Sequence, residues 1–434
     1  MDNFSVLKKK INSRTAKIAV VGLGYVGLPL AVYFGKKGYF VYGFDTDPAR
    51  VRKLEGGEKF IVDVDPKDVL RLIKSKKFRP TVDENVLGRA DVIIVCVPTP
   101  LRKVTLPDIS YVVSAARTIR KHLRKGQLVI LESTSYTTTT REVVLPILKE
   151  TGLRSERDFF LCFSPERVNP GDKKFPVVNI PKAVGGISER SARLAYDLYS
   201  KIMKKVFKVS SPEVAETSKL LENTFRLVNI ALINEFAIVC HKLGISVWEV
   251  LECAKTKPFG FMPFYPGPGI GGHCIPCDPV FLSWKAKKLG FKTEMIDLAS
   301  KMNRFMPKYT VERVKEMLKK QGRGLKNANI LVLGAAYKKD VKDLRESPAL
   351  DIIKELTEEK ARVSYFDPFF PYLNIDDINL KCVKLDKKTL SKVDCVILIT
   401  DHTAVNYDLV RRNSRLIFDT RHVYKENFAN IRTL

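Results

Sequence analysis

The segment from Ile18 to Gly27 constrains the fold more than any other. Its sequence is IAVVGLGYVG, in which an apolar run typical of a buried strand is followed by Gly22, Gly24 and Gly27, and the next residues, LPLAVYFGKKG, have the pattern of a helix. The glycines of such a turn allow a tight bend, close approach of a pyrophosphate, and close packing of helix on strand. The chain is therefore predicted to contain a Rossmann-like α/β domain that binds a dinucleotide.

An acidic residue at the end of the second predicted strand identifies the dinucleotide. Asp45 follows VYGF, at the spacing from the glycines at which a carboxylate accepts hydrogen bonds from the ribose hydroxyls. A carboxylate there repels the 2′-phosphate of NADP, so NAD is the predicted cofactor, with FAD as the alternative. The other residues assigned to cofactor binding in this part of the chain are Tyr25, Val26, Arg50 and Thr99.

The 434 residues divide into three predicted domains. Residues 1–209 alternate apolar strands with helices, as an NAD-binding Rossmann domain does. Residues 210–320 begin with an unbroken helical pattern from Ser211 to Gly244, and they are predicted to form a central helical domain that also carries the cysteine-containing loop described below. Residues 321–434 again follow a strand, turn, helix, strand order. The predicted class is α/β, with two Rossmann-like parallel-sheet domains joined by a long central helix and a helical middle domain.

The formal charge of +27 raises the question of nucleic-acid binding. The basic residues are scattered, without a zinc-finger, RNP or basic-zipper signature, so a lysine-rich surface that attracts anionic ligands is predicted instead. The alternative outside enzymes is an anion-binding or nucleic-acid-binding protein with a decayed enzyme fold.

No uncharged apolar run approaches the roughly 18 to 20 residues of a membrane span. The N-terminus lacks the features of a secretory signal, and we expect a cytoplasmic location without membrane association.

Eight cysteines lie mostly in apolar stretches and are expected to be reduced. Two of them end the loop FYPGPGIGGHCIPCD, from Phe264 to Asp278. A zinc site would need two further ligands at similar spacing, and prolines on both sides of Cys274 and Cys277 argue against the helix start of a thioredoxin motif. No metal is therefore expected, and Cys274 becomes a candidate nucleophile.

Other polar residues accompany this thiol. Lys219 and Asn223 are four apart on the predicted long helix and share a face, Glu166 follows the apolar run FFLCFSP at a strand end, and Asp278 is four residues beyond Cys274. Taken singly, each also fits a structural role, such as a surface lysine, a capping carboxylate or a turn aspartate. Together they would supply a nucleophile, a cation and an amide for an oxyanion, and two carboxylates.

Over nearly its whole length the sequence resembles the UDP-glucose/GDP-mannose 6-dehydrogenase family. The matching motifs, in chain order, are GLGYVGLPLA, CVPTP, EST, SPERVNPG, AETSKLLENTFRLVNIALINE, PGPGIGGHCIPCDP and AYKKDVKDLRESPA. The resemblance implies an NAD-dependent enzyme that oxidises C6 of a nucleotide sugar twice, from alcohol to carboxylate. It also implies a UDP-sugar-binding role for residues 321–434.

In their detailed sequences these motifs resemble the UDP-N-acetylhexosamine branch of the family, whose substrates are UDP-N-acetylglucosamine or UDP-N-acetylmannosamine. UDP-glucose enzymes tend to carry a second acid where this chain has Pro170. Two further departures are Thr137-Thr138, where relatives often have Pro-Gly, and Cys277. The alternatives are a UDP-glucose 6-dehydrogenase and a single-step dehydrogenase of the 3-hydroxyacid type.

The resemblance also implies roles for individual residues. Cys274 is the nucleophile, accompanied by Lys219, Asn223 and Asp278; Glu166 helps to activate the hydrolytic water, and Thr134 lies near the nicotinamide and positions water. Lys338 contacts the substrate diphosphate, and Arg345 reaches the cofactor. The remaining substrate-binding assignments are Arg226, for the N-acetyl carbonyl, and Phe264, Tyr265 and Gly271. The long helix suggests a homodimer or a higher homo-oligomer.

Overall fold

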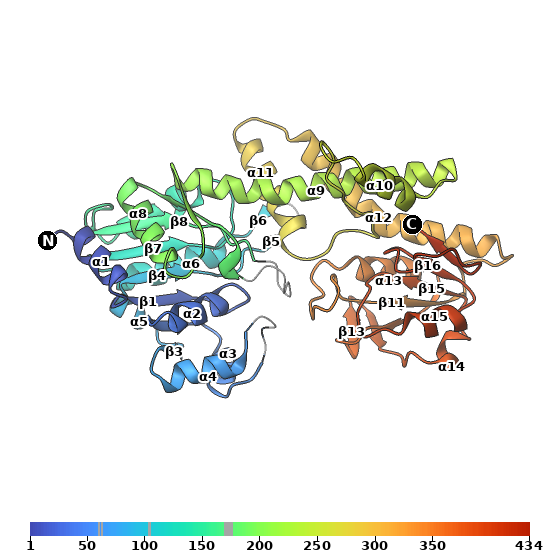
Figure 1. The fold of residues 1–434 in the computed structure, drawn as a ribbon, viewed down its shortest axis with the longest axis horizontal. Helices are drawn as coiled ribbons and strands as arrows, with labels where there is room; N and C mark the ends of the chain where they lie inside the picture. Colours follow the sequence, from blue (N-terminus) through green and yellow to red (C-terminus); the bar gives the residue numbers. More distant parts are fainter. Residues whose placement is uncertain (60, 62–63, 103–105, 169–176) are drawn as a thin grey trace. The chain divides into compact units, whose positions relative to one another are not determined.

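The structure, a computed structural model, describes residues 1–434 except 60, 62–63, 103–105 and 169–176. The described residues form two compact units, residues 1–222 with 280–291 and residues 223–279 with 292–434 (Figure 1). Each unit contains one main sheet with helices packed on it, and neighbouring strands of these sheets are parallel with one exception. The predicted α/β class with two Rossmann-like sheets is confirmed.

The sheet of the first unit has eight strands in the order β10-β9-β8-β7-β4-β1-β2-β3. Their bounds are β1 Lys17–Val21, β2 Phe40–Phe44, β3 Phe78–Thr81, β4 Val92–Val95, β7 Gln127–Leu131, β8 Phe159–Phe163, β9 Lys182–Gly186 and β10 Val206–Val209. The exception to the parallel pairing is β8 with β9, which is antiparallel. A short hairpin, β5 Leu101–Arg102 and β6 Leu106–Pro107, follows β4.

Helices cover both faces of this sheet, which explains why its central strands are almost entirely apolar. One face packs against α1 Asn3–Asn12, α2 Gly27–Lys36, α4 Pro66–Lys74 and α8 Glu189–Tyr199. The other packs against α5 Val86–Arg89, α6 Ser110–His122 and α7 Leu145–Lys149. The remaining helical segments are α3 Pro48–Glu55, a π-helical turn η1 Thr140–Val144 and a 3₁₀ turn η2 Val177–Asn179.

The sheet of the second unit has five parallel strands in the order β12-β11-β15-β16-β17. They are β11 Asn329–Leu333, β12 Arg362–Phe366, β15 Cys395–Leu398, β16 Ile417–Asp419 and β17 Ile431–Thr433. Helices α12 Glu294–Lys319 and α13 Pro348–Glu358 pack on one face, and α14 Lys387–Leu390 and α15 Tyr407–Asn413 on the other. A hairpin, β13 Tyr372–Ile375 with β14 Ile378–Lys381, follows β12.

The long predicted helix is α9, Pro212–Leu243, at the expected position. Ser211 Oγ accepts a hydrogen bond from Val214 N at 3.3 Å, and Gly244, with φ +73°, follows its last residue. Its 32 residues extend over roughly 48 Å. By length and hydropathy alone α9 could cross a bilayer. Its buried Asn234, which hydrogen-bonds Asn303 of α12 at 3.0 Å, is instead what a helix packed within a protein contains.

Two features of the central region differ from the sequence prediction. The sequence places Cys274 in a loop without a helix start, but this residue is the first of α11, Cys274–Lys288. Proline is tolerated in a first helical turn because the amide hydrogens there have no intrahelical acceptor, which accommodates Pro276. Helix α12 runs through Pro307 and is not predicted as a long helix by the sequence. The remaining helix of this region is α10, Val247–Lys255.

Candidate active site

Five predicted site residues lie along one edge of the first sheet. Glu166, Thr134, Thr99, Gly22 and Asp45 follow the carboxyl ends of β8, β7, β4, β1 and β2, which are five neighbouring, mutually parallel strands in that order. Ligands of doubly wound sheets bind outside the carboxyl ends of the strands. The order of the strands therefore brings predicted cofactor-binding residues and two predicted catalytic residues to one edge.

The glycine turn has the geometry that its sequence predicted. Gly22 has φ +90°, and a Cβ added to Gly27 would lie 1.9 Å from the Gly22 carbonyl oxygen, so both glycines are required by the turn itself. A Cβ on Gly24 would meet nothing within 4 Å. Tyr25 and Val26 complete the turn, and α2 begins directly after them. Gly24 thus leaves open the space that a pyrophosphate needs.

Asp45 is 4% exposed and holds this turn to the end of β2. Its carboxylate accepts hydrogen bonds from Leu23 N at 2.8 Å, Asp47 N at 3.0 Å and Arg50 Nη1 at 2.8 Å. Thr99, after β4, is also buried. A fixed carboxylate at the end of β2, beside a turn with space at Gly24, fits the ribose and pyrophosphate of NAD.

A buried ion pair that the sequence did not reveal lies behind Glu166. Lys182 Nζ is 2.6 Å from the Glu132 carboxylate, both side chains are buried, and the Tyr199 hydroxyl donates to the other Glu132 oxygen. Burial disfavours the charge of Lys182, but Glu132 and Glu166 outweigh it and hold the lysine pKa above its ordinary value. Glu166 and Lys182 line one small cavity. The signal in the sequence was a lysine and a glutamate next to apolar strands, where charges are rare without a partner.

At Thr137-Thr138, where relatives often have Pro-Gly, the chain forms a left-handed turn although glycine is absent. Thr138 has φ +84°, a conformation that costs about 1 kcal/mol or more for a residue with a side chain. The buried carboxylate of Glu216 holds this turn by accepting from Thr138 N at 2.6 Å and from Thr140 N at 2.9 Å and Oγ1 at 2.7 Å. Burial raises the pKa of Glu216 to about 7.

In the second unit the structure brings together three of the predicted catalytic residues. Cys274 is exposed at the start of α11, and Asp278 lies one turn further on the same helix. Asn223 Nδ2 donates to Asp278 Oδ2 at 2.5 Å, and both side chains are buried. Lys219, one turn before Asn223 on α9, belongs to the first unit and is 8% exposed. The positive end of a helix dipole favours a thiolate at Cys274.

The second cysteine of the pair has a different environment. Cys277 is buried, and burial raises the pKa of its thiol to about 12. All eight cysteines are within the described residues, and none of them forms a disulfide there. Position and exposure therefore favour Cys274 over Cys277 as the nucleophile.

The loop before Cys274 packs against the turn that follows β11. A Cβ on Gly271 would lie 2.5 Å from Tyr337 Cβ, and one on Gly272 would lie 2.8 Å from the Tyr337 ring. Gly272 N donates to the Arg345 carbonyl at 2.8 Å. Lys338, the predicted diphosphate contact, is the next residue after Tyr337 and is partly buried. The two segments are therefore neighbours within the second unit.

The other predicted substrate and cofactor contacts belong to the same unit. Arg226 is exposed on α9. The ring of Phe225, the residue before it, packs edge to face with the ring of Phe264, and the two ring centres are 5.7 Å apart. Tyr265 stacks on Trp248 of α10 at 6.2 Å. The Arg345 side chain is exposed and forms an ion pair with Asp343 at 2.6 Å.

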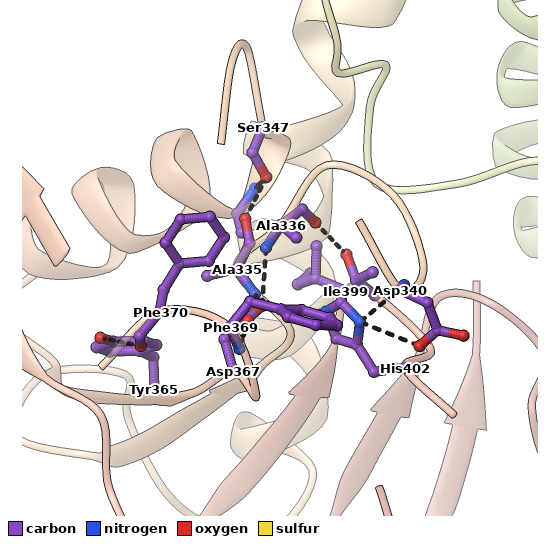
Figure 2. Close-up of polar contacts among 12 residues, drawn as sticks. Ala335, Ala336, Asp340, Ser347, Tyr365, Asp367, Phe369, Phe370, Ile399 and His402 are labelled. Carbon is purple, nitrogen blue, oxygen red and sulfur yellow. Dashed lines mark hydrogen bonds and ion pairs between the residues drawn. The ribbon is translucent and has the colours of Figure 1, made fainter. Parts of the chain in front are cut away.

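The turn after β11 is also held by two residues that the sequence did not identify. Asp367, after β12, accepts hydrogen bonds from Ala335 N and Ala336 N, and His402, after β15, hydrogen-bonds Asp367. Figure 2 shows these residues beside the turn. Both side chains are fully buried. The paired residues come from loops far apart in sequence, so no local pattern marks them.

Comparison with known proteins covers nearly all of this architecture. Residues 16–203 match the model of the UDP-glucose/GDP-mannose dehydrogenase family NAD binding domain, residues 213–305 its central domain, and residues 331–426 its UDP binding domain. Pro170, which stands where UDP-glucose enzymes tend to carry a second acid, is outside the described residues.

Curated relatives and a solved structure agree with these matches. The UDP-N-acetyl-D-glucosamine 6-dehydrogenase of Pseudomonas aeruginosa is 37% identical, over 96% of this chain and 99% of its own length. The UDP-N-acetyl-D-mannosamine dehydrogenase of Pyrococcus horikoshii is 36% identical, over 94% of this chain and 96% of its own. A solved structure of the P. horikoshii UDP-D-ManNAc dehydrogenase superimposes with a TM-score of 0.87 at 34% identity, covering 96% of this chain and 98% of that one. This chain belongs to the UDP-glucose/GDP-mannose dehydrogenase family, whose members are NAD-dependent oxidoreductases.

Proposed function

We propose that this protein oxidises C6 of a UDP-N-acetylhexosamine, either UDP-N-acetylglucosamine or UDP-N-acetylmannosamine, to the uronic acid, with two molecules of NAD reduced per sugar. The observation that carries the proposal is an exposed thiol at the start of α11, one turn from the buried Asn223–Asp278 pair. The names of the two curated relatives above support the substrate class. We assign residues 1–209 to NAD binding, 210–320 to the central catalytic segment, and 321–434 to UDP-sugar binding.

In the first oxidation Asp278, acting through a water or with Lys219, removes the proton of the C6 hydroxyl. NAD, held by the residues named next, would supply the acceptor for the hydride that leaves C6, and the sugar would become an aldehyde. The residues assigned to hold the cofactor are Gly22, Gly24, Tyr25, Val26, Gly27, Asp45, Arg50, Thr99 and Arg345. The proton passes to solvent, so this half-reaction is balanced by one hydride and one proton lost from the alcohol.

In the second oxidation the Cys274 thiolate attacks the aldehyde carbon and forms a thiohemiacetal. Lys219 and Asn223 stabilise its oxyanion until a hydride leaves to a second NAD, which produces a thioester. Glu166 then removes a proton from a water positioned by Thr134, and the hydroxide breaks the carbon–sulfur bond. The carboxylate is released and the Cys274 thiolate is restored.

Residues around the loop before Cys274 hold the substrate. Lys338 contacts the diphosphate, because an ammonium beside a backbone turn is a typical diphosphate ligand. Arg226 contacts the N-acetyl carbonyl, and Phe264, Tyr265 and Gly271 line the sugar site. The exposure of Arg226 on α9 is compatible with a ligand contact.

Stoichiometry and substrate preference test this function together. The purified protein is incubated with NAD and, separately, UDP-glucose, UDP-N-acetylglucosamine and UDP-N-acetylmannosamine, and NADH and the acid product are measured. We expect two NADH per N-acetylated sugar, whereas one NADH would indicate a single-step dehydrogenase. DNA binding that falls steeply with salt, without NADH formation, would contradict the enzymatic proposal.

Arg226→Ala should reduce the preference for N-acetylated sugars over UDP-glucose.

We further propose that the protein is a homodimer that uses α9. One side of this helix is apolar and exposed, with the residues Leu221, Phe225, Leu232, Phe236, Val239 and Leu243. Exposed apolar faces of this extent usually mark interaction surfaces. Leu232→Arg should shift the protein to monomer in light scattering, because the guanidinium would be buried without a partner. Tyr372→Arg, equally exposed on the β13–β14 hairpin, is the control and should leave the mass unchanged; a monomeric wild type would contradict the proposal.

We place the reaction in the cytoplasm, because the nucleophile must remain a thiol and reducing compartments preserve thiols. Cell fractionation with an activity assay tests this location.

A further inference from the structure

His402 lies between two loops at the carboxyl edge of the second sheet and makes one hydrogen bond with each ring nitrogen (Figure 2). Its Nδ1 accepts the backbone N–H of Asp340 at 3.0 Å, and its Nε2 lies 3.0 Å from Asp367 Oδ2. A backbone N–H only donates, so Nδ1 must carry the lone pair and Nε2 the hydrogen. The imidazole therefore bridges the two loops, as a donor on one side and an acceptor on the other.

On the donor side, Asp367 fixes the first part of the turn after β11. Its Oδ2 accepts from Ala335 N at 2.7 Å and from Ala336 N at 2.9 Å, and its Oδ1 accepts from Phe369 N at 2.8 Å. Burial opposes ionisation of this carboxyl, but the hydrogen bonds from His402 and from the backbone outweigh it and hold the pKa of Asp367 below its ordinary value. The anion thus organises the turn from within the core.

On the acceptor side, Asp340 fixes the other end of the same turn. Its backbone is left-handed, with φ +57°, and its carboxylate accepts from Thr403 N at 2.9 Å and from Thr403 Oγ1 at 2.5 Å. The segment from Ala336 to Asp340 is therefore anchored at both ends by the loops after β12 and β15. Tyr337 and Lys338 lie between the two anchors.

We propose that His402 is a positioning residue for the nucleotide-sugar diphosphate, because it fixes the backbone on which Lys338 is presented and on which Tyr337 packs against Gly271 and Gly272. The contacts of Tyr337 with these glycines, and of Gly272 N with Arg345 O, connect the same turn to the residues directly before Cys274. The inference rests on the proposed function, since it concerns the substrate of that reaction. A ligand contact that is preorganised in this way avoids the ordering cost at binding.

Two substitutions of His402 separate its two hydrogen bonds. In His402→Asn the amide oxygen lies near the place of Nδ1 and can still accept from Asp340 N, whereas in His402→Gln the amide nitrogen lies near the place of Nε2 and can still donate to Asp367. We expect each substitution to raise the KM for the UDP-sugar, by up to about tenfold, because each leaves one partner of His402 unpaired. The increase should be larger for His402→Asn, which removes a donor from the fully buried Asp367 carboxylate, than for His402→Gln, which leaves the part-buried Asp340 N–H unpaired, and the KM for NAD should stay unchanged in both.

A third variant tests the same turn at an exposed position, in case the substitutions of the buried His402 prevent folding. Thr403→Ala removes one of the two exposed hydrogen bonds to Asp340 and leaves the His402–Asp367 pair intact, so the KM for the sugar should rise in the same direction but less. Thermal melting is recorded for all variants. Wild-type protein that does not oxidise any UDP-sugar would refute the proposed function. An active wild type, together with folded His402→Gln and Thr403→Ala proteins whose sugar KM is unchanged, would refute the role of His402 alone.

Discussion

Cys274→Ser is expected to lower formation of the uronic acid by on the order of 10³-fold or more, the effect of removing a covalent nucleophile. The first oxidation does not use the thiol, so it should proceed and stop at the aldehyde, or leave an ester-like adduct on the introduced hydroxyl in place of the labile thioester. Rapid mixing should then show at most one NADH per sugar, and intact-protein mass spectrometry should detect any retained adduct. A variant that still formed two NADH per sugar at the normal rate would exclude Cys274 as the nucleophile.

The second cysteine of the pair supplies a matched control. Cys277→Ala removes a buried thiol three residues away on the same helix, and we expect it to keep the two-NADH stoichiometry. It should cost some thermal stability, because a small cavity replaces the sulfur. If Cys277→Ala instead abolished the second oxidation as completely as Cys274→Ser, both sulfurs would have to take part in the chemistry.

The elements that the sequence predicted well are those whose signals are local. From Ile18 to Val21 the strand before Gly22 is apolar because helices cover both faces of its sheet. Helix α9 is preceded by Ser211, has Pro212 as its first residue, and is followed by Gly244 in a left-handed conformation, so short-range capping chemistry marks both ends. Such signals act within a few residues and need no tertiary contact.

Elements with prolines were predicted less well. Pro276 and Pro279 suggested an irregular segment, yet α11 begins at Cys274 and continues past both. Helix α12 likewise runs through Pro307, whose neighbours in the core include Met306 and Tyr309. Apolar packing over many turns can outweigh the hydrogen bond that one proline removes, and that packing is determined by distant strands.

The least predictable features are paired polar groups far apart in the chain. Lys182 and Glu132 form an ion pair within the first sheet, and the Thr138 turn depends on Glu216, which lies on another element. Lys182 and Glu132 adjoin apolar strands, which indicates that each has a partner but not which residue it is. The partner that offsets the cost of its burial is brought near only by the folded sheet, so spacing in the sequence carries no sign of it.

Gly24→Ala is the second large expected effect, a loss of NAD affinity without a loss of stability. A Cβ at this position would meet nothing within 4 Å in the protein, so the fold should tolerate alanine, with melting unchanged or slightly higher because alanine restricts the unfolded chain. The methyl group would project into the space that the pyrophosphate needs, since the second glycine of this motif allows its close approach. We expect the KM for NAD to rise by about tenfold or more while the KM for the sugar changes little.

Two further alanine variants make this result specific. Gly27→Ala would place a Cβ 1.9 Å from the Gly22 carbonyl oxygen, so it should lower the melting temperature and NAD binding together. Gly324→Ala, at a position where a Cβ also meets nothing within 4 Å but which is remote in sequence from the cofactor turn, should change neither. Normal NAD binding by a folded Gly24→Ala protein would mean that the pyrophosphate does not approach this turn. Because Gly24 and Gly27 belong to one motif, the different effects of their alanine variants on stability would separate the glycine that the ligand requires from the glycine that the fold requires.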